Sequence, residues 1–170
     1  SWILVVMVIL TGLFFGSSER AIDKIQEARI AETAREMVVA DNWIVPHYNG
    51  ELRLQKPPLT YWTTALSYKA FGINEFATRI PSAIFSLATA LLLFIWLKRQ
   101  INVQVASNAV LVLASTFIGM RYFRSGEADA TLMFFICLAS FAGFYLVETG
   151  QRLMAWLLML GLGLGFLAKG

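Results

Sequence analysis

Charged residues are scarce in this sequence, and two long stretches contain none at all. Asp, Glu, Lys and Arg make up 15% of the 170 residues, whereas hydrophobic residues make up 58%. Residues 80–97 and 130–147 are each uncharged over 18 positions, about the length that crosses a hydrocarbon core roughly 30 Å thick. The composition therefore excludes an ordinary soluble domain and predicts an integral membrane protein.

Cysteine and histidine are almost absent. The single cysteine, Cys137, lies in the middle of an apolar run, which excludes a disulfide framework and predicts a packing role. The single histidine, His47, has no second histidine or cysteine near it in the sequence, so we expect no metal site from these residues alone. We predict no cofactor, leaving open only a divalent cation completed by residues outside this sequence. The net charge of +3 identifies no partner by itself, and no nucleic-acid partner is expected.

Hydrophobic segments divide the chain and predict an all-α membrane protein with about five transmembrane helices. The segments are 2–16, 80–97, 103–120, 130–147 and 153–168. The first and last lie against Ser1 and Gly170, so we expect residues 1–170 to be the N-terminal part of one longer transmembrane domain. The run GLGLG at 161–165 lies within the last segment, where glycines allow close helix packing, and no strand precedes it as in a nucleotide loop.

The charges that do occur gather on one side of the membrane. If every segment crosses, the long loop 17–79, the loop 121–129 and Lys169 share a face. Ten of the eleven acidic and eleven of the fourteen basic residues then lie there. The exceptions are Glu148, Lys98, Arg99 and Arg152. Basic residues near the ends of the short loops are equally divided, so charge alone does not say which face is cytoplasmic.

The long loop contains two helical patterns. Residues 25–39 place charged side chains on one face of a helix and apolar side chains on the opposite face. This pattern is typical of a helix lying along the membrane surface. Turn signals follow at Pro46 and at the pair Asn49-Gly50. Pro57-Pro58 then opens a second helix, which ends at Gly72 and carries aromatic residues suited to the interface.

Two acidic residues are candidates for catalysis. Glu27 falls on the apolar face of the first loop helix, together with Ile30, Ala31, Ala34 and Val38. A carboxylate there is costly unless it is paired or used; alternatively it only favours the helix N-terminus. Asp129 directly precedes an uncharged span and is either a site residue or the N-cap of that helix, and Glu127 is the alternative acid in the same loop.

Basic residues on the same face are candidates for binding an anion. Lys56 stands before the proline pair, which stiffens its approach to a helix N-terminus, and Lys169 ends an apolar helix. The alternative for both is a lysine that reaches to the lipid headgroups. Further candidates are Arg29, Arg121 and Arg124.

Five sequence blocks, in order, resemble the bacterial aminoarabinose transferase/protein O-mannosyltransferase family. The blocks are QEARIAETAREM, NWIVPHYNGELRLQKPPLTYW, ALSYKAFGINEFATRIPSA, RSGEADATLMFF and GLGFLAKG. Members of this family are membrane glycosyltransferases of the C-type fold that take sugars from polyprenyl phosphates. The resemblance implies a bacterial inner-membrane protein whose first long loop forms two juxtamembrane helices on the extracytoplasmic side, where the active site lies.

The resemblance also implies site residues and a reaction. The first motif of the family is typically Asp-Glu-x-Arg-Tyr, and it reads Gln26-Glu27-Ala28-Arg29-Ile30 here. The implied catalytic residues are Glu27 and Asp129, and the implied substrate-binding residues are Gln26, Arg29, Lys56 and Lys169. A sugar such as aminoarabinose or mannose would pass, with inversion, from a polyprenyl phosphate to a hydroxyl of a lipid A-like or protein acceptor. A carboxylate would act as base, and lysine or arginine would face the donor phosphate.

Two other functions compete with this one. A catalytically inactive scaffold or interaction protein of the same fold is the first, because the amide of Gln26 cannot accept a proton as a carboxylate would. A secondary transporter is the second, but it would carry ionisable groups within its spans near the midplane, where this sequence is uncharged.

Overall fold

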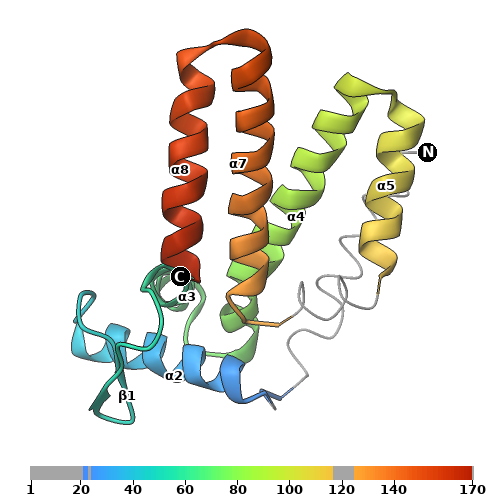
Figure 1. Ribbon diagram of the computed structural model, residues 1–170. Helices are drawn as coiled ribbons and strands as arrows, with labels where there is room; N and C mark the ends of the chain where they lie inside the picture. Colours follow the sequence, from blue (N-terminus) through green and yellow to red (C-terminus); the bar gives the residue numbers. More distant parts are fainter. Residues whose placement is uncertain (1–20, 23, 117–124, 170) are drawn as a thin grey trace.

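The computed structural model describes residues 21–22, 24–116 and 125–169. Upright helices stand on two helices that lie across their lower ends (Figure 1). The upright helices are α4 (Glu75–Gln100), α5 (Val103–Ser115), α7 (Asp129–Thr149) and α8 (Arg152–Ala168). The lower elements are α2 (Ile25–Ala40), the strands β1 (His47–Tyr48) and β2 (Glu51–Leu52), and α3 (Leu59–Phe71). We call these lower elements the platform.

Two of the upright helices are long and apolar enough to cross a membrane. They are α4, with 26 residues, and α7, with 21, and they contain the predicted spans 80–97 and 130–147. The helices α5 and α8 are apolar but shorter. The predicted span 2–16 and residues 117–120 of another lie outside the described residues.

A proline inside α4 is accommodated by a neighbouring side chain. Pro81 has no N–H, so the carbonyl of Ala77 one turn earlier lacks its helical donor. The Ser67 hydroxyl of α3 donates to that carbonyl at 2.7 Å. The helix itself begins at Glu75, five residues before the uncharged run, because the Asn74 side chain caps it by accepting from the Ala77 N–H at 2.8 Å. The Ser67 hydroxyl therefore joins α4 to the platform.

Helices α7 and α8 pack at very short range through glycine. A Cβ added to Gly161 would lie 2.8 Å from the backbone nitrogen of Ala139, closer than real Cβ atoms approach. The predicted close packing at the glycine run is therefore confirmed at Gly161.

The two platform helices bury a small core between them. Both have nearly the predicted bounds, 25–40 against 25–39 and 59–71 against a helix opened by Pro57-Pro58. The core is formed by Ile30, Ala34 and Met37 of α2 with Tyr61, Ala65 and Tyr68 of α3. Glu27 is buried with the apolar face, as its helical position predicts.

A short β-hairpin interrupts the expected all-α fold. His47 pairs with Leu52 and Tyr48 with Glu51, in antiparallel register. Asn49 and Gly50 form the turn at φ values of 52° and 77°, the left-handed conformation that a two-residue hairpin requires and that this residue pair tolerates well. The predicted turn at Asn49-Gly50 is thus confirmed. It joins two short strands, which the all-α prediction did not include.

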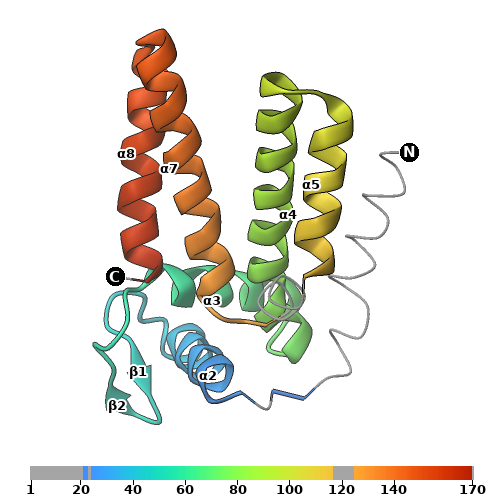
Figure 2. The same cartoon turned by 45° about the vertical axis from the view of Figure 1, so that its right-hand side comes forward.

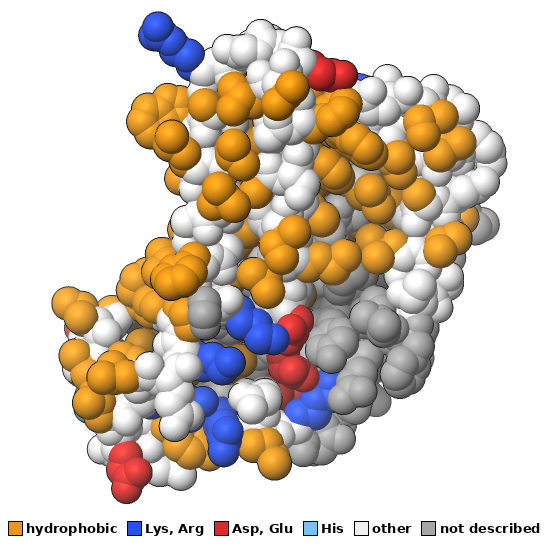
Figure 3. All heavy atoms as spheres, in the orientation of Figure 1, with side chains coloured by type: hydrophobic (Ala, Val, Ile, Leu, Met, Phe, Trp, Pro, Cys, Tyr) orange, Lys and Arg blue, Asp and Glu red, His pale blue; other side chains and the backbone are white. Residues whose placement is uncertain are grey.

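The predicted grouping of charges on one face is confirmed for the described elements. The α4–α5 and α7–α8 connections lie at one end of the upright helices, and the platform and the end of α8 lie at the other (Figures 1 and 2). In Figure 3, basic and acidic side chains gather in the lower part of the visible face, beneath helices that are largely apolar. This lower end is where a polar site can form.

Candidate functional site: a charged pocket at the foot of the helices

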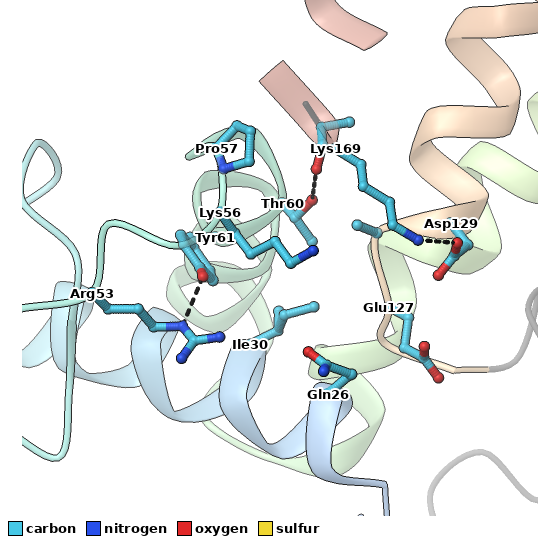
Figure 4. Close-up of a pocket in the computed structure, with 12 residues that line it drawn as sticks. Gln26, Ile30, Arg53, Lys56, Pro57, Thr60, Tyr61, Glu127, Asp129 and Lys169 are labelled. Carbon is cyan, nitrogen blue, oxygen red and sulfur yellow. Dashed lines mark hydrogen bonds and ion pairs between the residues drawn. The ribbon is translucent and has the colours of Figure 1, made fainter. Parts of the chain in front are cut away.

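A pocket of about 180 Å³ lies where the platform meets the lower ends of α7 and α8. It is smaller than pockets that enclose a whole drug-sized ligand, so it has room for only a small chemical group. Its lining residues are Gln26, Ile30, Arg53, Lys56, Pro57, Thr60, Tyr61, Glu127, Ala128, Asp129, Ala168 and Lys169 (Figure 4). The Thr60 hydroxyl of α3 donates to the carbonyl of Ala168 at 3.3 Å, which fastens the platform to the end of α8.

An ion pair forms one wall of the pocket. Lys169 Nζ lies 2.7 Å from Asp129 Oδ1, and both side chains are partly exposed. Asp129 is the first residue of α7, and its carboxylate does not cap the helix. Of the two roles that its position allows, the structure therefore shows the pocket residue and not the N-cap.

Lys56 reaches into the centre of the pocket. Figure 4 shows its side chain extending toward the space between Gln26 and Lys169. Within the described part of the chain no carboxylate lies within ion-pair distance of its ammonium. Gln26 lines the same space from the start of α2. Four of the six predicted site residues, Gln26, Lys56, Asp129 and Lys169, thus meet in one pocket.

The other two predicted site residues lie elsewhere. Glu27 accepts a hydrogen bond from Arg79 Nε at 2.8 Å and another from the Gly126 N–H at 3.0 Å. Glu27 is 2% exposed and Arg79 is 4% exposed, so this is a buried ion pair that joins α2 to α4. Neither Glu27 nor Arg29 is among the described residues that line the pocket.

Close packing around Glu27 fixes the loop that leads to Asp129. A Cβ on Gly126 would lie 2.8 Å from Thr78 Cγ2 and 3.3 Å from Glu27 Oε1. Only glycine fits there without a shift of its neighbours. Through Gly126, the buried carboxylate therefore helps to place the loop before α7. The predicted candidates Arg121 and Arg124 of the same loop lie outside the described residues.

Two further charged residues line the pocket. Glu127, the alternative acid, is held by Lys24, whose Nζ lies 3.2 Å from its carboxylate. Arg53 was not singled out from the sequence. It follows β2, it is 7% exposed, and its Nε donates to the Tyr61 hydroxyl at 2.9 Å. No signal in the sequence pointed to it, because alternation along an extended strand predicts Leu52 and Leu54 inward and Arg53 outward, the reverse of what the structure shows.

Other charges of the platform form surface pairs. Arg35 donates two hydrogen bonds to Glu32, three residues earlier on α2, and this holds the pKa of the Glu32 carboxyl below its ordinary value. Such exposed pairs contribute little to stability. Within the described ranges, no group of three His, Cys, Asp or Glu side chains is placed to hold a metal ion.

Comparison with known proteins identifies relatives along the whole chain. Residues 55–170 match the family model of dolichyl-phosphate-mannose-protein mannosyltransferases. The chain is 34% identical, over 99% of its length, to undecaprenyl phosphate-alpha-4-amino-4-deoxy-L-arabinose arabinosyl transferase 2 of Proteus mirabilis, of which it covers 31%. It is 33% identical, over 85% of its length, to the corresponding transferase of Pseudomonas aeruginosa, of which it covers 27%. The chain thus spans less than a third of the length of these relatives.

Solved structures share the same fold. The crystal structure of ArnT from Cupriavidus metallidurans bound to undecaprenyl phosphate superposes with a TM-score of 0.89. The apo form superposes with a TM-score of 0.87. Each comparison covers 99% of this chain and 32% of the other, at 24% sequence identity. The arrangement of upright helices on a platform is therefore that of a known membrane-protein fold.

Proposed function

The chain belongs to the dolichyl-phosphate-mannose-protein mannosyltransferase family, and we propose that it forms the donor-binding part of a membrane glycosyltransferase supplied by a polyprenyl-phosphate sugar. The names of its relatives favour 4-amino-4-deoxy-L-arabinose as the sugar and undecaprenyl phosphate as the carrier. One observation carries the proposal: a headgroup-sized pocket, lined by cations and one accessible aspartate, lies directly at the foot of apolar helices. A lipid carrier would lie along those helices with its phosphate at the pocket.

The proposed reaction transfers a sugar with inversion at its anomeric carbon. The acceptor hydroxyl gives its proton to the Asp129 carboxylate as its oxygen bonds to that carbon. The bond between the carbon and the donor phosphate oxygen breaks, and the electron pair leaves with the phosphate. The departing phosphate thereby changes from a singly charged diester to a monoester carrying about two negative charges. The ammonium groups of Lys56 and Lys169 stabilise this growing negative charge. Their attraction for the phosphate therefore increases toward the transition state.

The contacts support different roles for the two predicted acids. Asp129 faces the pocket, whereas both hydrogen bonds to Glu27 come from the protein interior. We propose that Asp129 is the base and that Glu27 is a positioning residue, which holds α2 and the loop before α7 in place. Gln26 would orient the substrate from the start of α2, whereas Arg29, predicted for the same role, lies outside the pocket lining.

We place the pocket on the extracytoplasmic side of a bacterial inner membrane. About five transmembrane helices would then alternate across it, with the platform as two juxtamembrane helices. The acceptor would be a lipid A-like molecule or a protein hydroxyl. Exposed apolar residues of the platform, such as Ile44 and Phe71, favour contact with membrane lipids.

One observation favours the inactive scaffold as the second candidate. Gln26 lines the pocket at the position where the family typically has an aspartate, and an amide cannot act as a base. Asp129 provides a carboxylate in the same pocket, so the enzyme is the better supported of the two.

Sugar transfer by the full-length protein tests the proposal. The assay supplies radiolabelled undecaprenyl-phosphate aminoarabinose and lipid A to the protein in liposomes, and Lys56→Ala is compared with Lys98→Ala. Lys98 is an exposed lysine at the opposite end of α4 and serves as the matched control. We expect transfer by the wild type and by Lys98→Ala, and at least about a tenfold loss for Lys56→Ala. A folded wild type that transfers no lipid-linked sugar would support the scaffold instead.

A further inference from the structure

The charges that line the pocket do not balance. Lys169 neutralises Asp129, and Lys24 neutralises Glu127. Arg53 and Lys56 remain, and among the described residues neither has a carboxylate within ion-pair distance. Two positive charges therefore line one side of a small pocket without an anion from this part of the chain.

The uncompensated charge is most costly at Arg53. Lys56 is exposed and can be solvated, but Arg53 is 7% exposed. A buried guanidinium without an anion is unfavourable, because the protein interior solvates charge less well than water does. An anion bound at the guanidinium would relieve this cost.

The hairpin fixes the direction in which Arg53 points. Its backbone N–H donates to the carbonyl of Pro46 at 2.9 Å, which extends the hairpin by one residue pair. Leu52 and Leu54 on either side are 59% and 73% exposed. Alternation along the extended chain thus turns Arg53 inward, toward the pocket.

Two aromatic residues hold the guanidinium in place. The Tyr61 hydroxyl accepts from Nε at 2.9 Å, and Tyr61 is itself only 1% exposed. The ring of Tyr48 lies 5.4 Å from the guanidinium carbon. Because Nε is occupied by Tyr61, the two terminal nitrogens remain to bind a ligand, and Figure 4 shows one of them directed toward Ile30.

We propose that Arg53 is a phosphate-binding residue that, held by Tyr61, forms with Lys56 a two-cation cradle for the donor phosphate. This inference rests on the proposed function, since it names a further residue of the same site. The planar fork of arginine binds two phosphate oxygens at once, which a lysine cannot do. Arg53 therefore fixes the orientation of the phosphate, and Lys56 adds charge. The cradle selects a phosphorylated carrier over the neutral alcohol.

Binding measurements on the full-length protein in nanodiscs test this role. The ligands are undecaprenyl phosphate, the neutral alcohol undecaprenol, and inorganic phosphate as a competitor. We expect Arg53→Gln to weaken the binding of undecaprenyl phosphate about 10- to 100-fold, which is the range for a lost hydrogen bond to a charged group. The binding of undecaprenol should be unchanged. Arg53→Lys should recover part of the loss, and Tyr61→Phe should cause a smaller loss of about threefold or more. Lys69→Gln on the outer face of α3 is the matched control and should bind as the wild type does.

Each outcome decides between a ligand-binding and a structural arginine. The assignment would be overturned if Arg53→Gln lost binding to both lipids equally. It would also be overturned if folded Arg53→Gln and Tyr61→Phe bound undecaprenyl phosphate as the wild type does. Either result would leave the proposed function intact. A wild type that binds neither lipid would overturn both. Inorganic phosphate that competes fully with undecaprenyl phosphate would show that the cradle recognises the phosphate group alone. If inorganic phosphate no longer competes with undecaprenyl phosphate in Arg53→Gln, the cradle is supported. If it still competes in that variant, the cradle is contradicted.

Discussion

Lys169 Nζ lies 2.7 Å from Asp129 Oδ1, so the end of α8 closes an ion pair with the beginning of α7, 40 residues earlier. The pair lies at the pocket surface and is partly exposed. Exposed pairs are weak, which allows the lysine to exchange one anion for another. An arriving phosphate would attract Lys169 and leave the Asp129 carboxylate free to accept a proton.

The exchange predicts distinct effects of changing Lys169. Lys169→Ala should weaken binding of undecaprenyl phosphate and also lower turnover, since a cation on the phosphate acts both before and during the reaction. Equilibrium binding and single-turnover transfer measure the two effects separately. Unchanged binding together with lower turnover would contradict a ground-state contact between Lys169 and the phosphate.

Loss of the Asp129 charge should affect chemistry more than binding. Asp129→Asn keeps the shape of the side chain but removes the base, so we expect turnover to fall by about 10²-fold or more while donor binding persists. Glu127→Gln is the matched control, because Lys24 already pairs with that carboxylate. A larger loss in Glu127→Gln than in Asp129→Asn would reassign the base to Glu127.

The buried pair of Glu27 and Arg79 should contribute mainly to stability. Glu27→Ala removes the buried carboxylate that neutralises Arg79 and accepts from the Gly126 N–H, so it should lower the free energy of unfolding by about 3–5 kcal/mol. The double variant Glu27→Ala/Arg79→Ala should lose clearly less stability than the sum of the losses in the two single variants. Thermal unfolding in detergent measures both. Full stability of Glu27→Gln together with lost turnover and intact donor binding would instead assign a catalytic role to Glu27.

The hydroxyl of Ser67 should matter only because Pro81 is present. Ser67→Ala leaves the Ala77 carbonyl without a donor and should cost about 1–3 kcal/mol of stability. In a Pro81→Ala background the restored helical N–H can serve that carbonyl, so the same serine change should cost less. An equal cost in both backgrounds would mean that the hydroxyl stabilises the fold in some other way.

Membrane topology can be tested by labelling with an impermeant thiol reagent. In a background without Cys137, cysteine at Glu51 of the hairpin should react from one side of the membrane. Cysteine at Gln100 or Gln151, at the opposite end of the upright helices, should react only from the other. We expect the Glu51 position to react from outside intact cells. Labelling of Glu51 and Gln100 from the same side would refute the alternation of spans.

The helices of this protein were largely predictable because their signals are local. Apolar run length identified α4 and α7, helical periodicity gave the bounds of α2, and the proline pair and Gly72 gave those of α3, within one or two residues. Helical periodicity placed Glu27 on the buried face of α2 without any knowledge of its partner. The hairpin turn at Asn49-Gly50 was likewise read from two residues, although its strands were not.

The composition of the site depended on contacts between distant segments. Sequence position treated Glu27 and Asp129 alike, but the fold buries the first against Arg79, 52 residues away, and turns the second toward the pocket. It also brings Lys24 to Glu127 across 103 residues, which leaves Arg53 and Lys56 as the uncompensated charges. The sequence by itself therefore determined which of the described segments are helical and at which end of the upright helices the charges gather, because both follow from local periodicity and the order of apolar runs. Only the tertiary structure decided which charges neutralise one another and which face the pocket, because that depends on how distant helices pack.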